Sequence, residues 1–447
     1  MKRVAGALGL LLAGCFASPG GAMDAGTGGP PACGDGVTDP GEACDDGNTA
    51  DGDWCAAACD QAWGVDVHDP ATAGRIDILF VVDNSASMCE EQINLRASFQ
   101  SFIDALVAAG GIDFQIGVVT TDTMDPMQSG RLQNVPRALM NTDDCTVALP
   151  PPDDCTTGLP SPLPKILTPA TVDLAHVFGC IASVGIDGFG GEAPLAAVEL
   201  ALSPPLAAPG GANEGFLRDD AALAVVFVGD EDDCSVCDDP AWPGQCQFMP
   251  SITQNLDCAL WQVDSLTPVS TFVDVMRARR PPGRVITAGV IGLDPSGASA
   301  GPVFADPDEV NYPDQLYPIC TSSSGRAAPA PRIESYVRAF APLAAETSIC
   351  TDDFAAPLAD LGTRFGVAVD ENNCLLSTPC PGLTAADVQV AYLDAAGAAV
   401  TVDPADYTLV ADATCPGGQA LDFTAPPPAG SVLVVTYPAQ SPTGLGC

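Results

Sequence analysis

Hydrophobic runs and amphipathic segments alternate along the middle of the chain. Four apolar runs rich in β-branched residues have the length of buried strands: 76–82, 114–121, 221–228 and 285–291. Apolar residues recur at helical spacing in six further segments: 95–106, 172–181, 195–202, 267–276, 333–340 and 354–361. This alternation predicts an α/β domain with a doubly wound, mostly parallel sheet over residues 70–370.

The predicted domain is long for one sheet of this kind. Its excess length lies in Pro- and Cys-rich insertions, at roughly 123–170, 232–262 and 294–330, which we expect to rim the binding face. Among the helical segments, Thr267-Pro268 predicts a helix cap followed by Pro at the first helical position.

The pattern changes after Cys374. Short runs with strand character are separated by turns that contain Gly and Pro: 388–393, 407–410, 421–423 and 432–437. They predict a small all-β, sandwich-like module over residues 374–447. Four cysteines are placed to cross-link it: Cys374, Cys380, Cys415 and Cys447.

A small cysteine-rich module precedes the main domain, at residues 33–60. It reads C-G-D-G from Cys33 and G-E-A-C-D-D-G-N around Cys44, with almost no apolar residues beyond Val37 and Trp54. Such a segment cannot bury a core, so its cysteines are expected to hold it together. It resembles the short cysteine-rich repeat common in secreted and surface proteins of myxobacteria.

The first residues have the features of an export signal. A basic start, Met1-Lys2-Arg3, is followed by the apolar stretch 4–12, which is too short to span a bilayer. The next residues, Leu-Ala-Gly-Cys, resemble the lipobox of bacterial lipoproteins. The resemblance implies that residues 1–14 are removed and that Cys15 carries a lipid anchor. An ordinary signal peptide with a chance cysteine is the alternative.

The lipid would be the chain's link to the membrane. Residues 15–32 are mostly Gly, Pro and Ala and predict a flexible tether. Phe16, rather than Asp, follows the cysteine, which by the same resemblance favours the outer membrane. The chain carries 57 acidic and 16 basic residues, a net charge of −41, so anionic headgroups would not attract it. The same charge attracts cations and argues against nucleic acid as a partner.

The cysteine count also predicts export. There are 19 cysteines, and removing Cys15 as the lipid site leaves 18, which can all pair in an oxidising compartment. Zinc is the competing interpretation, because Cys234 and Cys237 form a C-x-x-C. That motif has no partner pair at zinc-ribbon spacing, and the chain has only two histidines. We therefore interpret the cysteines as structural disulfides whose connectivity the sequence does not define.

The most specific motif is Asp83-Asn84-Ser85-Ala86-Ser87, directly after the run 76–82. It places one carboxylate and two hydroxyls at the carboxyl end of a predicted strand, where open α/β sheets bind ligands. Three hard oxygen donors at a spacing of two suit Mg²⁺ or Mn²⁺, with Ca²⁺ as a further candidate. The alternative is a helix N-cap, which explains one of the three residues.

The D-x-S-x-S pattern resembles the metal-ion-dependent adhesion site of von Willebrand factor type A domains. The resemblance implies a Rossmann-like parallel sheet between helices and a ligand bound through the metal. In that family a later strand ends in an Asp that completes the site, usually within Thr-Asp-Gly. Here the run 221–228 ends in Gly229-Asp230, so Asp230 matches and its neighbours do not. The acidic residues 231–233 are expected to form a solvated loop.

The metal-binding Thr of most members of the family is missing. The glycine-rich loop 188–195 is similar instead to the integrin β-subunit variant, in which a Glu serves, and this implies Glu192 as a ligand. The alternative is a Glu that favours a helix N-terminus beside Pro194. Residues 120–122, at the end of the second predicted strand, are expected near the same edge.

Three functions are open at this point. The first is a lipid-anchored envelope protein that binds a protein ligand through a divalent cation held by five residues: Asp83, Ser85, Ser87, Glu192 and Asp230. A carboxylate from the partner would complete the coordination. The second is a metal-dependent hydrolase, but G-x-S-x-G and H-E-x-x-H are absent and we interpret His68 and His176 as structural. The third is a structural envelope protein with a degenerate metal site.

Overall fold

The main domain is built on one five-stranded parallel sheet. The computed structural model describes residues 33, 42–44, 49, 55–68, 74–108, 112–137, 155, 158–189, 191–237, 246–248, 266–280, 284–294, 297, 318–322, 325–340, 343–368, 373–393, 399–413, 415, 417–425, 428, 431–440 and 447. The strands are β2 (Arg75–Val82), β3 (Asp113–Thr120), β4 (Ala222–Val228), β7 (Val285–Ile291) and β10 (Ala344–Ser348). Their order is β10-β7-β4-β2-β3, with every neighbouring pair parallel. The prediction of a doubly wound α/β domain is confirmed.

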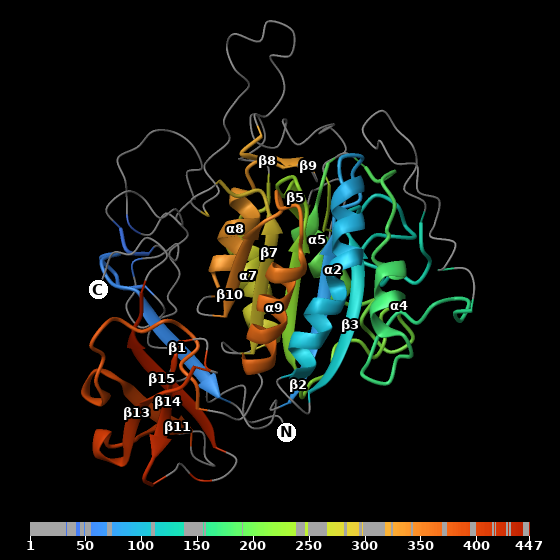
Figure 1. Ribbon diagram of the computed structural model, residues 1–447. Coiled ribbons are helices and arrows are strands. Elements are labelled where there is room, and N and C mark those ends of the chain that lie inside the picture. Colours follow the sequence, from blue (N-terminus) through green and yellow to red (C-terminus); the bar gives the residue numbers. More distant parts are fainter. Residues whose placement is uncertain are drawn as a thin grey trace, which may run out of the picture.

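Helices cover both faces of the sheet (Figure 1). One face carries α2 (Cys89–Ala108), α4 (Leu174–Ile181) and α9 (Ala355–Ala368), and the other carries α5 (Pro194–Leu202), α7 (Val269–Arg279) and α8 (Pro331–Arg338). Strand β2 shows why two layers are needed. Its even-numbered residues, Ile78 and Phe80 among them, pack in the first core, and Leu79 and Val81 pack in the second. A strand buried on both faces reads as a continuous apolar run.

The carboxyl ends of β2 and β4 meet at the point where the strand order reverses. From β2 the chain crosses to β3 on one side and later returns to β4 on the other side. The two strand ends are joined directly, because the N–H of Asp83 donates to the carbonyl of Val228 at 2.9 Å. In open α/β sheets, ligands bind in the crevice at this position.

The C-terminal module is all-β, as predicted, but it takes one strand from before the main domain. Its sheet has the order β1-β15-β11-β12, formed by β1 (Trp63–His68), β15 (Val432–Pro438), β11 (Gln389–Leu393) and β12 (Ala399–Thr401). A hairpin of β13 (Tyr407–Ala411) and β14 (Gln419–Phe423) shares its core. The disulfides Cys374–Cys415 and Cys380–Cys447 cross-link the module. The predicted boundary at residue 374 therefore leaves out β1.

Three further differences concern element ends and edges. The edge strands β10 and β12 were not predicted, because each is short and carries few apolar residues. Helix α7 begins at Val269, so Pro268 lies at the N-cap rather than at the first helical position. Short hairpins, β5 (Ser235–Cys237) with β6 (Cys246–Phe248) and β8 (Cys320–Ser322) with β9 (Gly325–Ala327), occupy parts of the predicted insertions.

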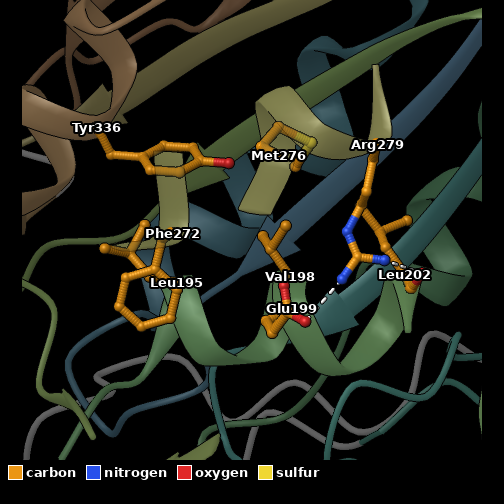
Figure 2. Close-up of a pocket in the computed structure, with 8 residues that line it drawn as sticks. All are labelled: Leu195, Val198, Glu199, Leu202, Phe272, Met276, Arg279 and Tyr336. Carbon is orange, nitrogen blue, oxygen red and sulfur yellow. Dashed lines mark hydrogen bonds and ion pairs between the residues drawn. The ribbon is translucent and has the colours of Figure 1, made fainter. Parts of the chain in front are cut away.

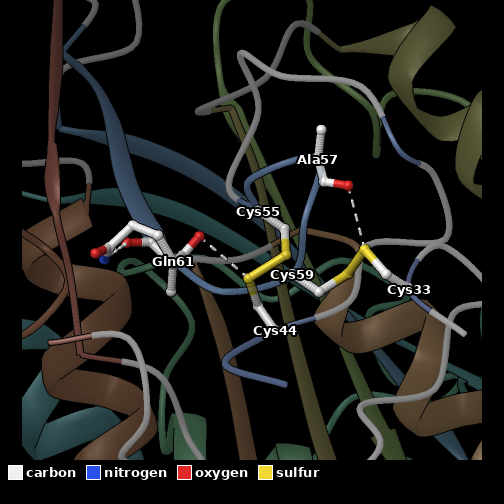
Figure 3. Close-up of a disulfide and its surroundings, with 7 residues drawn as sticks. Cys33, Cys44, Cys55, Ala57, Cys59 and Gln61 are labelled. Carbon is white, nitrogen blue, oxygen red and sulfur yellow. Dashed lines mark hydrogen bonds between the residues drawn. A yellow bond between two sulfur atoms is a disulfide. The ribbon is translucent and has the colours of Figure 1, made fainter. Parts of the chain in front are cut away.

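The N-terminal cysteines form two disulfides, Cys33–Cys59 and Cys44–Cys55 (Figure 3). The sulfur of Cys44 also lies 3.3 Å from the carbonyl oxygen of Gln61, at the start of the segment that leads into β1. The prediction that cysteines hold this module together is confirmed for these residues. The export signal, Cys15 and the tether at 15–32 lie outside the described residues. Among the described helices, none is long and apolar enough to cross a membrane.

A buried carboxyl group connects β1 to the rest of the C-terminal module. The Oδ2 atom of Asp66 accepts hydrogen bonds from Tyr437 Oη at 2.8 Å and from the N–H of Leu376 at 2.9 Å. Gly64 lies opposite Tyr437 in the ladder, and a Cβ at Gly64 would overlap the tyrosine ring. Burial raises the pKa of Asp66 to about 7, and the two hydrogen bonds oppose that rise.

We predict that Asp66 makes the module more stable in acid than at neutral pH. Because its folded pKa of about 7 exceeds its ordinary value of 3.8, the contribution is complete below pH 3.8 and is lost as the pH rises through 7. Urea unfolding at several pH values should therefore give a wild-type minus Asp66→Asn difference that shrinks from acid to neutral pH. Asp422 is exposed, and Asp422→Asn is the matched control. A wild-type minus Asp66→Asn difference in unfolding free energy that stays constant with pH would contradict the prediction.

Candidate metal-binding site

The loop after β2 presents its oxygen atoms on one side. Asp83 is fully buried, and its Oδ1 atom accepts the N–H of Ser85 at 2.7 Å, which folds the loop. The hydroxyl oxygens of Ser85 and Ser87 lie 3.1 Å apart. The second carboxylate oxygen of Asp83, Oδ2, is buried and has no hydrogen-bond partner. Local folding therefore uses one oxygen of this carboxylate and leaves the other available.

Glu192 and Asp230 join this loop from two other parts of the chain. Glu192 precedes α5 and is 1% exposed; its Oε2 atom accepts a hydrogen bond from the Thr121 hydroxyl, and its Oε1 atom has no partner. Asp230 follows β4 and is 3% exposed; it receives a hydrogen bond from Ser87, and its Oδ1 atom has no partner. Both carboxylates interact with Asp83. The structure thus brings together all five residues that the sequence pattern indicates.

One more carboxylate, Glu91, faces the same cluster. It lies in the first turn of α2, is 1% exposed, and its Oε2 atom has no hydrogen-bond partner. Burial, followed by repulsion from Asp230, raises its pKa to about 9. The motif did not predict this residue. The available signal was its position in the first turn of the helix that follows the D-x-S-x-S motif.

The electrostatics of the cluster favour a cation. Burial is the largest cause of a raised pKa at Asp83, to about 6, at Asp230, to about 8, and at Glu192. Repulsion from Asp83 raises the pKa of Glu192 and Asp230 further. Unpartnered buried carboxylate oxygens are costly, and a hard divalent ion is the ligand that such an oxygen set fits. The side chains therefore match Mg²⁺ or Mn²⁺ by donor type, burial and charge.

Two glycines allow the loops to approach this closely. A Cβ at Gly229 would lie 3.1 Å from Asp83 Cβ and 3.2 Å from Asp83 Oδ2. At Gly188, a Cβ would overlap the side chain of Asn84, and the N–H of Gly188 donates to the Asn84 carbonyl at 2.9 Å. Gly229 therefore leaves room for the Asp83 carboxylate.

The Gln92 side chain links two loops of the site by hydrogen bonds. Its amide nitrogen donates to the carbonyl of Asp83 at 3.0 Å and to that of Gly185 at 2.8 Å. Its amide oxygen accepts the N–H of Val184 at 3.1 Å. One buried side chain on α2 therefore joins the loop after β2 to the loop that leads to Glu192.

The expectation of a solvated acidic loop at 231–233 is wrong for Asp233. This residue is 1% exposed, and its carboxylate accepts hydrogen bonds from the N–H of Leu195 at 3.0 Å and from Arg332 at 2.9 Å. Asp232 accepts the N–H groups of Arg332 and Ile333 at the start of α8. Arg332 lies about a hundred positions further along the chain, so the local sequence gives no sign of these bonds.

The segment 120–122 also lies at the site. Besides Glu192, Thr121 contacts the Asn84 side chain at 3.4 Å. Asp122 instead accepts the N–H groups of Met124 at 2.7 Å and Asp125 at 3.0 Å, and so shapes the loop after β3. The two histidines lie elsewhere, His68 in β1 and His176 in α4, where His176 Nδ1 is 3.0 Å from Asp173.

A cavity of about 10 Å³ lies away from this edge, between α5, α7 and α8 (Figure 2). Its lining includes the ion pair of Arg279 and Glu199, at 2.6 Å, with Phe272 and Tyr336 beside it. That volume is at the lower limit for a single water molecule, so this cavity is not a substrate pocket. The chemistry-bearing side chains are concentrated at the carboxyl edge of the sheet.

Comparisons with known proteins give similarities in structure. No protein-family model matches the sequence, and no curated protein matches it. Among solved structures, the pilus adhesin SpaC of Lactobacillus rhamnosus GG has 10% identity and a TM-score of 0.34; the match covers 85% of this chain and 41% of SpaC. A von Willebrand factor type A protein of Catenulispora acidiphila has 10% identity and a TM-score of 0.29, with 85% and 66% covered.

The pilus adhesin RrgA of Streptococcus pneumoniae is also similar, with 10% identity, a TM-score of 0.25, and coverage of 86% of this chain and 58% of that one. The chain thus spans less than half of SpaC and about two thirds of the type A protein. At these scores, the assignment of the fold rests on the strand order and connections described above.

We predict that Gln92→Ala destabilises the protein and loosens the site. The change leaves a buried N–H and two buried carbonyls without their partner, and such a loss costs about 2 kcal/mol in the free energy of unfolding. Chemical denaturation measures the effect. Gln100→Ala, an exposed glutamine on the same helix, is the control and should change stability by less than about 0.5 kcal/mol. Equal losses of unfolding free energy in Gln92→Ala and Gln100→Ala would show that the Gln92 hydrogen bonds do not stabilise the loops.

Proposed function

We propose that this protein binds a divalent cation, Mg²⁺ or Mn²⁺, and through it a carboxylate of a protein ligand. The observation that supports the proposal is the group of buried carboxylate oxygens without hydrogen-bond partners, from Asp83, Glu192 and Asp230, beside the hydroxyls of Ser85 and Ser87. These five side chains would hold the ion. Their position at the switch point of the sheet leaves the outer side of the ion for a ligand.

The sign of the charge explains why the ion would control binding. The cluster is anionic, and so is the chain as a whole, with a net charge of −41. A carboxylate on a partner would be repelled by both. A divalent cation at the centre of the cluster offsets two of the three negative charges of Asp83, Glu192 and Asp230, and it supplies a coordination position that an oxygen of the partner can fill. Binding would therefore depend on metal and be reversed by chelators.

The setting we propose is the cell envelope. Disulfides occur in the N-terminal module, the main domain and the C-terminal module, as an oxidising compartment would allow. The lipobox-like residues before Cys15 support a lipid anchor, with residues 15–32 as a tether and the outer membrane as the favoured location. Together these features support the proposal of an adhesin-like protein held at the envelope by lipid.

The metal site is tested by isothermal titration calorimetry of the full chain with Mg²⁺, Mn²⁺ and Ca²⁺. We expect binding of one ion in the wild-type protein and an increase in melting temperature with metal, because the ion binds the folded state. Ser85→Ala, Glu192→Gln and Asp230→Ala should each weaken binding by about tenfold or more.

Asp360→Ala removes an exposed carboxylate on α9 and is the matched control, which should bind metal like the wild type. The absence of metal-dependent heat in a folded wild-type protein would refute the metal site. A loss of affinity in Ser85→Ala and Asp230→Ala but not in Glu192→Gln would exclude Glu192 as a ligand. Folding of each variant is checked by circular dichroism before titration.

A further inference from the structure

Exposed apolar side chains gather on one side of the candidate metal site. Among the described residues, seven large hydrophobic side chains are exposed, and three of them lie on two loops next to the site: Met124 at 37%, Met127 at 72% and Phe189 at 36%. Met124 and Met127 follow β3, and Phe189 precedes Glu192. Methionine and aromatic residues are enriched in protein interfaces, and apolar side chains grouped on a surface mark contact sites.

The structure holds these loops in place. The N–H of Met124 and the N–H of Phe189 both donate to the carboxylate of Asp122, at 2.7 Å and 3.4 Å. The N–H of Gly188 donates to the carbonyl of Asn84, within the D-N-S-A-S loop, at 2.9 Å. The apolar side chains are therefore attached, through short hydrogen-bonded connections, to the loop that carries Asp83 and the two serines.

The other side of the site carries a positively charged side chain. The β8–β9 hairpin contains Arg326, which is exposed. The residues around it contact the acidic cluster: Ala328 donates its N–H to the carbonyl of Asp230 at 2.8 Å, and a Cβ at Gly325 would overlap Glu91 Oε1. Gly325 has φ of 130°, which favours glycine and permits this approach. The disulfide Cys320–Cys350 fastens the hairpin to the loop after β10, at the edge of the sheet opposite β3.

Arg326 differs from most described arginines in its surroundings. Several others form ion pairs with carboxylates at 2.5–2.9 Å: Arg218, Arg279, Arg332, Arg338 and Arg364. The described residues give Arg326 no such ion pair, and its charge acts on Asp230, where it opposes the rise in pKa. An exposed guanidinium that forms no ion pair with the described residues can bind a carboxylate of a ligand.

We infer that the site and its surroundings form a docking surface for an acidic peptide segment of a partner protein. One carboxylate of the segment would bind the metal, a second would bind Arg326, and an apolar side chain on the other flank would contact Met124, Met127 and Phe189. This inference rests on the proposed metal-dependent function and adds the chemistry of the ligand. The charge of Arg326 selects an acidic segment, and the apolar flank sets its direction.

The inference is tested with a library of random peptides displayed on phage. The full chain is immobilised with Mg²⁺, and bound phage are released with EDTA. We expect the released sequences to be enriched in one pattern, two acidic residues with an apolar residue on one side. A synthetic peptide of the most enriched sequence is then measured by fluorescence polarisation. Arg326→Glu should weaken it by about tenfold or more, and Met127→Ser by about threefold or more.

Two matched controls and one double change separate docking from general effects. Arg364→Glu reverses the charge of an exposed arginine on α9, and Val172→Ser removes an exposed apolar side chain outside both loops; neither should alter binding. Replacing the second acidic residue of the peptide by its amide should weaken binding to the wild type but not to Arg326→Glu. That coupling identifies the contact between the two charges.

Several results would overturn the inference. One such result is that the EDTA-released peptides share a single acidic residue and bind Arg326→Glu and Met127→Ser as they bind the wild type. The inferred docking surface is then refuted, although the proposed metal-dependent binding stands. The docking surface is equally wrong if metal binds in calorimetry but no peptide is released by EDTA, or if only a sulfated polysaccharide binds with Mg²⁺. If no metal binds, the proposed function itself fails.

Discussion

Repulsion among buried carboxylates is the constraint around which the carboxyl edge of this sheet is arranged. Asp83, Glu91, Glu192 and Asp230 are each at most 3% exposed, and each has a carboxylate oxygen without a hydrogen-bond partner. Burial raises the pKa values of all four carboxyl groups, and repulsion from neighbouring carboxylates raises those of Glu91, Glu192 and Asp230 further. A protein keeps such a group only if the surrounding structure is stable enough to hold it.

The scaffold meets that requirement with contacts that do not depend on the carboxylates themselves. The strand ends of β2 and β4 are joined by a backbone hydrogen bond, and Gln92 ties two loops to helix α2. Below them, β2 lies between two hydrophobic cores and is apolar almost throughout. The stability of the cores thus supports an edge that is electrostatically strained, a common division between scaffold and site.

Much of this arrangement could be predicted from sequence, because the signals are local. The apolar run before Asp83 and the run before Asp230 identify two central strands, and their parallel pairing places both residues at one edge. What could not be predicted depends on contacts between distant segments. The pairing of Asp233 with Arg332 buries an acidic residue that looks solvated. Strand β10, with the sequence A-A-E-T-S, lacks the apolar character that marks a strand.

The pairing of β1 with β15 has a consequence for how the protein assembles. These neighbours in one sheet come from residues 63–68 and 432–438, and the whole main domain is encoded between them. The C-terminal sheet is therefore incomplete until residues 432–438 have been synthesised and pair with β1. Such a long-range closure is entropically expensive and slow, whereas the main domain can form its parallel sheet from the residues in between. We therefore expect the pairing of β1 with β15 to form after the parallel sheet, and this pairing joins the two segments that flank the main domain.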